Sequence, residues 1–201
     1  MSRTQILGRN PGNGRCNRVL VEDGIITSIE ESDETCDLWI SAGLIDLQVN
    51  GYVGLDFNGE DIVPQTVVEL VEAMLTTGVT CFAPTVITAP EAMILRSLRA
   101  IADAREGDSL AAACIPFVHM EGPHISPIDG YRGAHPQESV RPPSLAEFDR
   151  WQEACGGLIG LVTLSPHFEE SEEYISSLTA VEFMYRLGIH MPRRNRSGTQ
   201  S

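Results

Sequence analysis

Two segments of the chain alternate apolar and polar side chains with the period of a β-strand, and both carry polar groups toward their carboxyl ends. Residues 43–51 form the first segment and residues 115–122 the second. The polar positions on one face are Asp46, Gln48 and Asn50 in the first segment and His119 and Glu121 in the second. Side chains at the carboxyl ends of parallel strands meet at one edge, which is how a β/α barrel assembles an active site.

Strands and helices alternate from residue 41 onward. We expect strands at 43–50, 80–88, 115–122 and 158–165, and the beginning of a fifth at 188–190. Pro84 lies inside the second strand and cannot donate to the ladder, so a bulge or an early strand end is expected there. The order predicts an α/β fold, a (β/α)8 TIM barrel truncated after about four and a half β/α units.

The helices between these strands have recognisable ends. One is expected to begin at Pro64 and to close at Gly78, and the next to run from about Pro90 to Arg105. Ser144 opens a third helix in a capping box. A fourth helix is expected from residue 171 to residue 187.

Residues 1–40 read as a small β unit in front of the partial barrel. Residues 18–22 and 25–29 form two short strands joined by Asp23 and Gly24, the composition of a tight hairpin turn. The partial barrel domain is expected at 41–190. Residues 191–201 carry three arginines and no acidic residue, a change of composition that suggests a frameshift, an alternative splice end or appended residues.

Composition excludes several classes of function. The net charge of −14 and the pI of about 4.6 argue against nucleic acid and against anionic membranes as partners. The chain has no lysine, which excludes Schiff-base chemistry and a P-loop lysine. No signal peptide and no apolar run of membrane-spanning length is seen, so the expected location is the cytoplasm.

The five cysteines are scattered and odd in number: Cys16, Cys36, Cys81, Cys114 and Cys155. No pair has the spacing of a metal-binding or redox motif. We therefore expect neither a disulfide framework nor a thiolate zinc site.

The strongest local signal is His-Met-Glu-Gly-Pro at 119–123, followed by Gly-Ala-His-Pro at 133–136. Glu121 lies where a barrel strand meets its loop, and a carboxylate there can ligate a divalent metal while Gly122 and Pro123 turn the chain away. His119, on the same strand face, either supports that carboxylate by a hydrogen bond from beneath or is a satisfied core histidine. The loop 122–143 is long and rich in proline, which favours a functional loop.

Gln48 and Asn50 form a second polar group at the end of the first barrel strand. Barrel metallohydrolases often have two histidines in these positions, whereas neutral amides are poor metal ligands. Amides are good hydrogen-bond partners for a substrate or a water. The alternative is that they only satisfy backbone groups near the barrel mouth.

Five motifs in order carry a resemblance to a known family. They are Gly-Leu-Ile-Asp-Leu-Gln-Val-Asn-Gly (43–51), Gly-Val-Thr-Cys-Phe-Ala-Pro-Thr (78–85), His-Met-Glu-Gly-Pro (119–123), Gly-Ala-His-Pro (133–136) and Val-Thr-Leu-Ser-Pro (162–166). From about residue 18 to 190 the chain resembles the N-terminal half of N-acetylglucosamine-6-phosphate deacetylases, which belong to the amidohydrolase superfamily. The hairpin at the start then corresponds to part of that family's small β-sandwich.

The resemblance implies an activity and a set of site residues. Glu121 matches the metal-binding glutamate, His135 and its neighbour Ala134 match substrate contacts, and Gln48 and Asn50 match the form of the family with a single metal. Asp46 and His119 would support these residues. The implied cofactor is one divalent metal per subunit, zinc before others. A metal-activated water would remove the acetyl group from the amino-sugar phosphate and release the amine and acetate. A homodimer is implied for the full-length family.

The chain also departs from the family pattern. The family's two metal-binding histidines, its general acid/base aspartate and most phosphate-binding residues lie beyond the fourth strand, so we expect no catalytic residue in this chain. His190 comes too early to be a ligand, and His167 has no assigned role. Two alternatives therefore stay open. One is an inactive truncated product that pairs with full-length subunits, and the other is an amidohydrolase of cyclic amides, which the motif at 119–123 disfavours.

Overall fold

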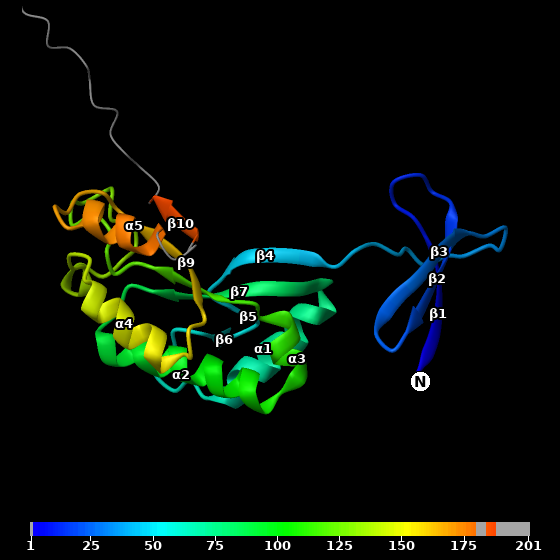
Figure 1. Cartoon of the computed structure of the whole chain (residues 1–201), viewed down its shortest axis with the longest axis horizontal. Helices are drawn as coiled ribbons and strands as arrows, with labels where there is room; N and C mark the ends of the chain where they lie inside the picture. The colour runs from blue at the N-terminus through cyan, green and yellow to red at the C-terminus, as the bar shows by residue number, and fades with distance from the viewer. Residues whose placement is uncertain (1, 180–183, 188–201) are drawn as a thin grey trace, which may run out of the picture. The chain divides into compact units, whose positions relative to one another are not determined.

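The computed structural model describes residues 2–179 and 184–187. The chain divides into two compact units, Met1–Gly43 and Leu44–Ser201 (Figure 1). The backbone N–H of Ile40 donates to the carbonyl of Arg9 at 3.0 Å, and Arg9 forms an isolated bridge with Trp39. The segment that ends at residue 40 thus belongs to the first unit, which extends a little beyond the predicted boundary.

The first unit is an antiparallel sheet of three strands in the order β1-β2-β3. The strands are β1 (Arg3–Arg9), β2 (Cys16–Glu22) and β3 (Ile25–Glu31). Asp23 and Gly24 have φ angles of 49° and 82°, the left-handed conformation that a two-residue hairpin turn needs at both positions. The predicted hairpin is confirmed, β1 adds a strand that was not predicted, and a sandwich partner for this sheet stays a prediction.

The expectation that no cysteines pair is wrong, because Cys16 and Cys36 form a disulfide with their Cα atoms 6.2 Å apart. Pairing of β2 with β3 places Asn17 opposite Glu31, and the N–H of Ser32 donates to the carbonyl of Cys16 at 2.9 Å. The hairpin thus returns the chain to the start of β2 just before Cys36. Spacing along the sequence could not reveal this meeting, which depends on strand register.

Reduction of this disulfide is expected to destabilise the first unit. The bond closes a loop with a sequence separation of 20, and a loop of that size stabilises a fold by about 3 kcal/mol in the chain-entropy model. Hydrogen exchange of residues 3–31 should therefore accelerate in the Cys16→Ser/Cys36→Ser variant, with no change in the second unit. Equal protection in variant and wild type would contradict the expectation. The Cys114→Ser variant, which removes a buried free thiol, is the matched control.

The second unit contains a parallel sheet with the strand order β10-β9-β8-β7-β4. Its strands are β4 (Leu44–Val49), β7 (Val79–Ile87), β8 (Val118–Glu121), β9 (Ile159–Leu164) and β10 (Met184–Leu187). A two-stranded ribbon of β5 (Gly51–Tyr52) and β6 (Leu55–Asp56) follows β4. The α/β fold with a parallel sheet is confirmed, and its closure into a barrel stays a prediction.

Helices α1 to α4 lie side by side along one face of this sheet (Figure 1). The helices are α1 (Pro64–Thr76), α2 (Glu91–Gly107), α3 (Ser109–Cys114), α4 (Leu145–Ala154) and α5 (Ser171–Thr179), with a short 3₁₀ turn, η1, at Gln137–Ser139. The apolar stripes of α1 and α2 pack with Phe82, Met120 and Trp151 in one continuous core. Within the described ranges, no helix has the length and apolar character needed to cross a bilayer.

Two predicted elements differ from the structure. The strand expected from 115 begins only at Val118, because Pro116 cannot donate to a ladder, and the short helix α3 precedes it. The helix expected to reach residue 187 is wrong in its second half, since α5 ends at Thr179 and Met184–Leu187 is instead the strand β10, parallel to β9. The fifth strand expected at 188–190 and the tail at 191–201 lie outside the described residues.

Pro84 ends the pairing between β4 and β7, as predicted. The register shifts between Asp46 and Val49 where Val49 pairs with Pro84. Beyond this irregularity, the side chain of Asn58 replaces the lost strand: its Nδ2 donates to the carbonyl of Thr85 at 3.0 Å, and its Oδ1 accepts from the N–H of Ile87 at 2.8 Å. The last residues of β7 therefore keep backbone hydrogen bonds on the side where β4 no longer pairs with them, while β8 pairs with their other side.

Candidate functional site

Glu121 is the last residue of β8, and the chain leaves the sheet directly after it. Gly122 has a φ of 86°, a left-handed conformation that glycine adopts without strain. A Cβ at this position would collide with Oγ1 of Thr88 and come within 2.9 Å of Ile125. The sharp turn predicted at Gly122 is thus present, and the side chain of Glu121 keeps 17% of its surface exposed.

Three segments that are distant in sequence meet at the carboxylate of Glu121. Nε2 of Gln48, from β4, donates to Oε2 of Glu121 at 2.7 Å. Nε2 of His135, from the long loop, lies 3.8 Å from Oε1 of Glu121. The predicted metal ligand and two of the predicted substrate contacts are therefore side by side.

His119 lies below Glu121 on the same strand and is 1% exposed. Its Nε2 pairs with Oγ1 of Thr163 at 2.8 Å, and its Nδ1 pairs with Oγ1 of Thr85 at 3.3 Å. These threonines come from the strands on either side, β7 and β9. Both ring nitrogens are thus engaged by hydroxyl groups, so His119 cross-links the three central strands beneath the candidate site.

The remaining predicted residues have different surroundings. Oδ1 of Asp46 accepts the backbone N–H of Gln48 at 3.0 Å, so Asp46 fixes the strand that presents Gln48. Asn50 is exposed, and its carbonyl accepts the N–H of Phe57 at 3.0 Å. Ala134 lines the same cavity as Glu121 and His135. His167 is hydrogen-bonded to Ser165 and its ring lies 6.0 Å from that of Tyr131.

A cavity of about 380 Å³ opens above Glu121. Its base is formed by the ends of β8 and β9, and its wall by the loop that follows β8. The lining residues are Glu121, Ile125, Ser126, Gly130, Tyr131, Arg132, Gly133, Ala134, His135, Thr163 and Ser165. Sequence reasoning missed Tyr131, Arg132 and Thr163, although the first two directly precede the Gly-Ala-His-Pro motif. The volume is within the range of small-molecule sites.

The two ends of the loop that carries His135 are hydrogen-bonded to each other. We call these ends, Pro123–His124 and Arg141, the neck of the loop. The N–H of Arg141 donates to the carbonyl of Pro123 at 3.2 Å, and the carbonyl of Arg141 lies 3.2 Å from Nδ1 of His124. The N–H of Ser165 also donates to the carbonyl of His124 at 2.7 Å, which ties the neck to the end of β9. Long loops inside a compact domain are commonly functional when they are ordered, and these hydrogen bonds hold the two ends of this one together.

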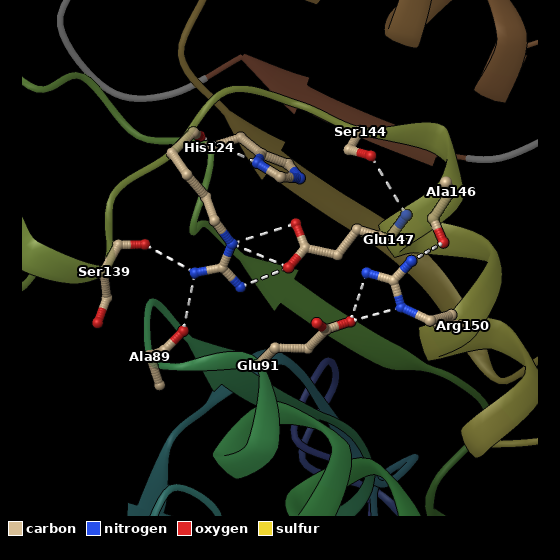
Figure 2. A network of polar contacts seen from close by, with 9 residues as sticks. Ala89, Glu91, His124, Ser139, Ser144, Ala146, Glu147 and Arg150 are labelled. Carbon is tan, nitrogen blue, oxygen red and sulfur yellow. Dashed lines mark hydrogen bonds and ion pairs between the residues drawn. The ribbon is translucent and has the colours of Figure 1, made fainter.

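The guanidinium of Arg141 holds the neck against α4 and against the loop after β7. It makes two bonds to Oε1 of Glu147, of 2.9 Å from Nε and 2.6 Å from Nη2. Its Nη1 donates to the carbonyls of Ala89 and Ser139 at 3.1 and 2.8 Å. Figure 2 shows Glu147 at the centre of this network, with Ser144 capping its helix and the surface pair of Arg150 and Glu91 at its side.

A divalent metal fits this site only in part. Glu121 offers a carboxylate at the base of the cavity, and His135 offers an imidazole beside it. Within residues 2–179 and 184–187, however, no three histidine, cysteine or acidic side chains gather as a metal site would require, and a zinc site commonly uses at least three protein ligands. The described residues by themselves thus do not complete such a site.

Comparison with known proteins places these features in one family, although no family model matches the chain. N-acetylglucosamine-6-phosphate deacetylase of Bos taurus is 35% identical over 152 residues, which cover 74% of this chain and 36% of the relative. The Bacillus subtilis protein of the same name is 31% identical over 166 residues, or 79% of this chain and 40% of the relative. The chain spans well under half of the length of these relatives.

Solved structures agree with the curated relatives. The deacetylase of Pasteurella multocida has a TM-score of 0.70 and 25% identity, with 86% of this chain and 46% of that chain covered. A mutant of the Mycobacterium smegmatis protein, solved in complex with N-acetyl-D-glucosamine-6-phosphate, has a TM-score of 0.76. It shares 20% identity and covers 94% of this chain and 50% of its own, so it supports the fold. The resemblance inferred from the motifs is confirmed.

Proposed function

Because the matched part of the chain belongs to the N-acetylglucosamine-6-phosphate deacetylase family, a group of hydrolases acting on linear amides, we propose that the protein serves this reaction. The substrate would be N-acetylglucosamine 6-phosphate, and the products would be glucosamine 6-phosphate and acetate. The observation that supports the proposal most strongly is that Gln48 and His135, from two other segments, approach the carboxylate of Glu121, and that Glu121 and His135 line one cavity.

Each of the three side chains has a chemical part in this proposal. The carboxylate of Glu121 would provide one ligand to a divalent metal, zinc before others, and such a site commonly needs about two further protein ligands. Such a metal would polarise the acetamide carbonyl and activate water. The amide of Gln48 orients the carboxylate through Oε2, and the imidazole of His135, beside Glu121 in the cavity lining, would hydrogen-bond the sugar.

The proposal also covers the fold, the oligomeric state and the cellular location of the protein. We propose that the parallel sheet is part of a (β/α)8 barrel, that the active form is a homodimer, and that the protein works in the cytoplasm. Sedimentation velocity tests the dimer. Cell fractionation tests the location: we expect the protein in the cytosolic fraction, and recovery from a membrane or secreted fraction would contradict the proposal.

The reaction is tested by following acetate with proton NMR after adding Zn²⁺ and N-acetylglucosamine 6-phosphate to the full chain. We expect acetate and glucosamine 6-phosphate in equal amounts, and at least a 100-fold lower rate for Glu121→Gln, about the effect of removing one electrostatic contact to a transition state. Glu173→Gln, an exposed substitution on α5, is the control and should keep the wild-type rate. Acetate release that survives Glu121→Gln would overturn the role of Glu121.

A second candidate function is that of a non-catalytic partner of complete deacetylase subunits. The observation that favours it is that Glu121 is the single acidic residue among the described residues that line the cavity. The same experiment separates the two proposals: binding of the substrate without acetate release, and a rate that changes when a complete homologous deacetylase is mixed with the chain, would support the partner function.

A further inference from the structure

Three buried rings meet where the neck of the long loop packs on helices α4 and α5. His124 is 0% exposed, Trp151 0% and Tyr174 1%. The ring of His124 stacks on Trp151 with centroids 5.6 Å apart, and it lies edge-on to Tyr174 at 5.3 Å. One residue comes from the loop, one from α4 and one from α5, so the three parts of the fold share this contact.

Each of these rings carries a polar atom without a hydrogen-bond partner among the described residues. The atoms are Nε2 of His124, Nε1 of Trp151 and the hydroxyl oxygen of Tyr174. Leaving one buried polar group unsatisfied costs about 1–3 kcal/mol, so three in one contact would be a large penalty. Protein interiors relieve such penalties with buried waters, which typically make about three hydrogen bonds each.

The hydrogen-bonding capacities of the three atoms are complementary to one water. Nδ1 of His124 faces the carbonyl of Arg141 at 3.2 Å, and a carbonyl only accepts, so Nδ1 carries the proton and Nε2 is an acceptor. Burial lowers the pKa of His124 to about 4, which keeps the ring neutral. The indole N–H of Trp151 is a donor, and the hydroxyl of Tyr174 can donate or accept a hydrogen bond.

The hydroxyl of Tyr174 stays protonated in the folded protein. Burial raises the pKa of Tyr174, and the negative charges of Glu147 and Asp149 on α4 raise it further. Trp151 belongs to the same helix, one turn beyond Glu147. The neutral hydroxyl is therefore an available donor on a ring that packs against His124, as the indole of Trp151 also does.

We infer that an internal water is bound between His124, Trp151 and Tyr174, donating to Nε2 of His124 and accepting from the indole N–H and the tyrosine hydroxyl. The water completes the hydrogen bonding of all three atoms. It also connects the neck of the loop to α4 and α5, in addition to the direct bonds from Arg141 to Glu147. The site is separate from the cavity above Glu121, and the inference does not depend on the proposed reaction.

Removal of the Tyr174 hydroxyl is expected to change the unfolding equilibrium constant in opposite directions depending on whether the water is bound. Tyr174→Phe keeps the ring contacts with His124 and Phe148 but removes one partner of the water. The unfolding equilibrium constant should then rise about three- to tenfold, the range for loss of one hydrogen bond. If the hydroxyl is unsatisfied in the native protein, the same substitution removes a penalty and the constant should fall. Tyr131→Phe, whose parent side chain is 38% exposed, is the matched control.

A measurement on the wild-type chain does not depend on the folding of any variant. In a ¹⁵N-edited NOE experiment, the indole N–H of Trp151 should show a cross-peak to a long-lived water, and the cross-peak should disappear or weaken in Tyr174→Phe. A crystal structure with one water within hydrogen-bond distance of the three atoms would support the inference. An empty contact, or an indole N–H without a water cross-peak, would overturn it.

Discussion

Replacement of Arg141 by alanine is expected to lower the free energy of unfolding by about 3 kcal/mol, the lower end of the range for breaking a buried ion pair. The side chain of Glu147 is only 7% exposed and that of Arg141 27%. The alanine variant leaves the carboxylate of Glu147 buried without its bidentate partner, and it leaves the carbonyls of Ala89 and Ser139 without a donor. Urea unfolding followed by circular dichroism measures the change.

The chain offers a matched control for this prediction on the same helix. Arg150 pairs with Glu91 at 2.8 Å, but the two side chains are 51% and 35% exposed. Exposed pairs contribute about 0–1 kcal/mol, so Arg150→Ala should have a small effect. Equal losses of stability in the two variants would contradict the assignment of Arg141 as the residue that holds the loop neck.

A fall of pH from 7.5 to 4.5 is expected to destabilise the protein through His124. Burial lowers the pKa of His124 from its usual 6.5 to about 4, so below pH 6.5 the unfolded chain takes up a proton that the folded protein excludes. The free energy of unfolding that depends on a neutral His124 is fully present above pH 6.5. It is lost as the pH falls toward 4, by about 3 kcal/mol in total. Unfolding by urea at several pH values measures the slope.

Carboxylates titrate in the same pH range as His124. Comparing the pH dependence of stability in the wild type and in a His124 variant separates the effect of the histidine from theirs. In His124→Gln the difference in stability between pH 7.5 and pH 4.5 should shrink by most of that amount. His167→Gln, which removes a partly exposed histidine, should keep the wild-type slope. A wild-type slope in His124→Gln would mean that His124 is protonated in the folded protein, contrary to its burial.

The features that sequence reasoning predicted are those encoded by neighbouring residues. Asp23 and Gly24 are local turn formers, and both adopt the predicted left-handed conformation. The hydroxyl of Ser144 accepts the N–H of Glu147 as the capping box requires. Glu121 ends its strand because Gly122 and Pro123 follow it. In each case the cause lies within a few residues of the effect.

The missed features depend on contacts between distant residues. Cys16 meets Cys36 only after β2 and β3 have paired. Asn58 substitutes for a strand beside Thr85 and Ile87, and nothing near Asn58 in the sequence indicates this. Similarly, the Glu147 of the capping box turns its carboxylate to Arg141. Strand register and loop packing determine these contacts, so the periodicity of the sequence alone cannot predict them.

Binding of N-acetylglucosamine 6-phosphate to the full chain tests the central claim most directly, namely that Gln48, Glu121 and His135 form one substrate site. Isothermal titration calorimetry should show binding by the wild-type chain. His135→Ala should weaken it about tenfold, the effect of one lost hydrogen bond to a ligand. Gln48→Ala should weaken it by a similar factor, because the carboxylate of Glu121 loses the bond that orients it. Gln65→Ala removes a similar amide–carboxylate bond on the surface of α1 and should leave the affinity unchanged. Absence of binding by the wild-type chain, or equal affinities in all four proteins, would contradict the account.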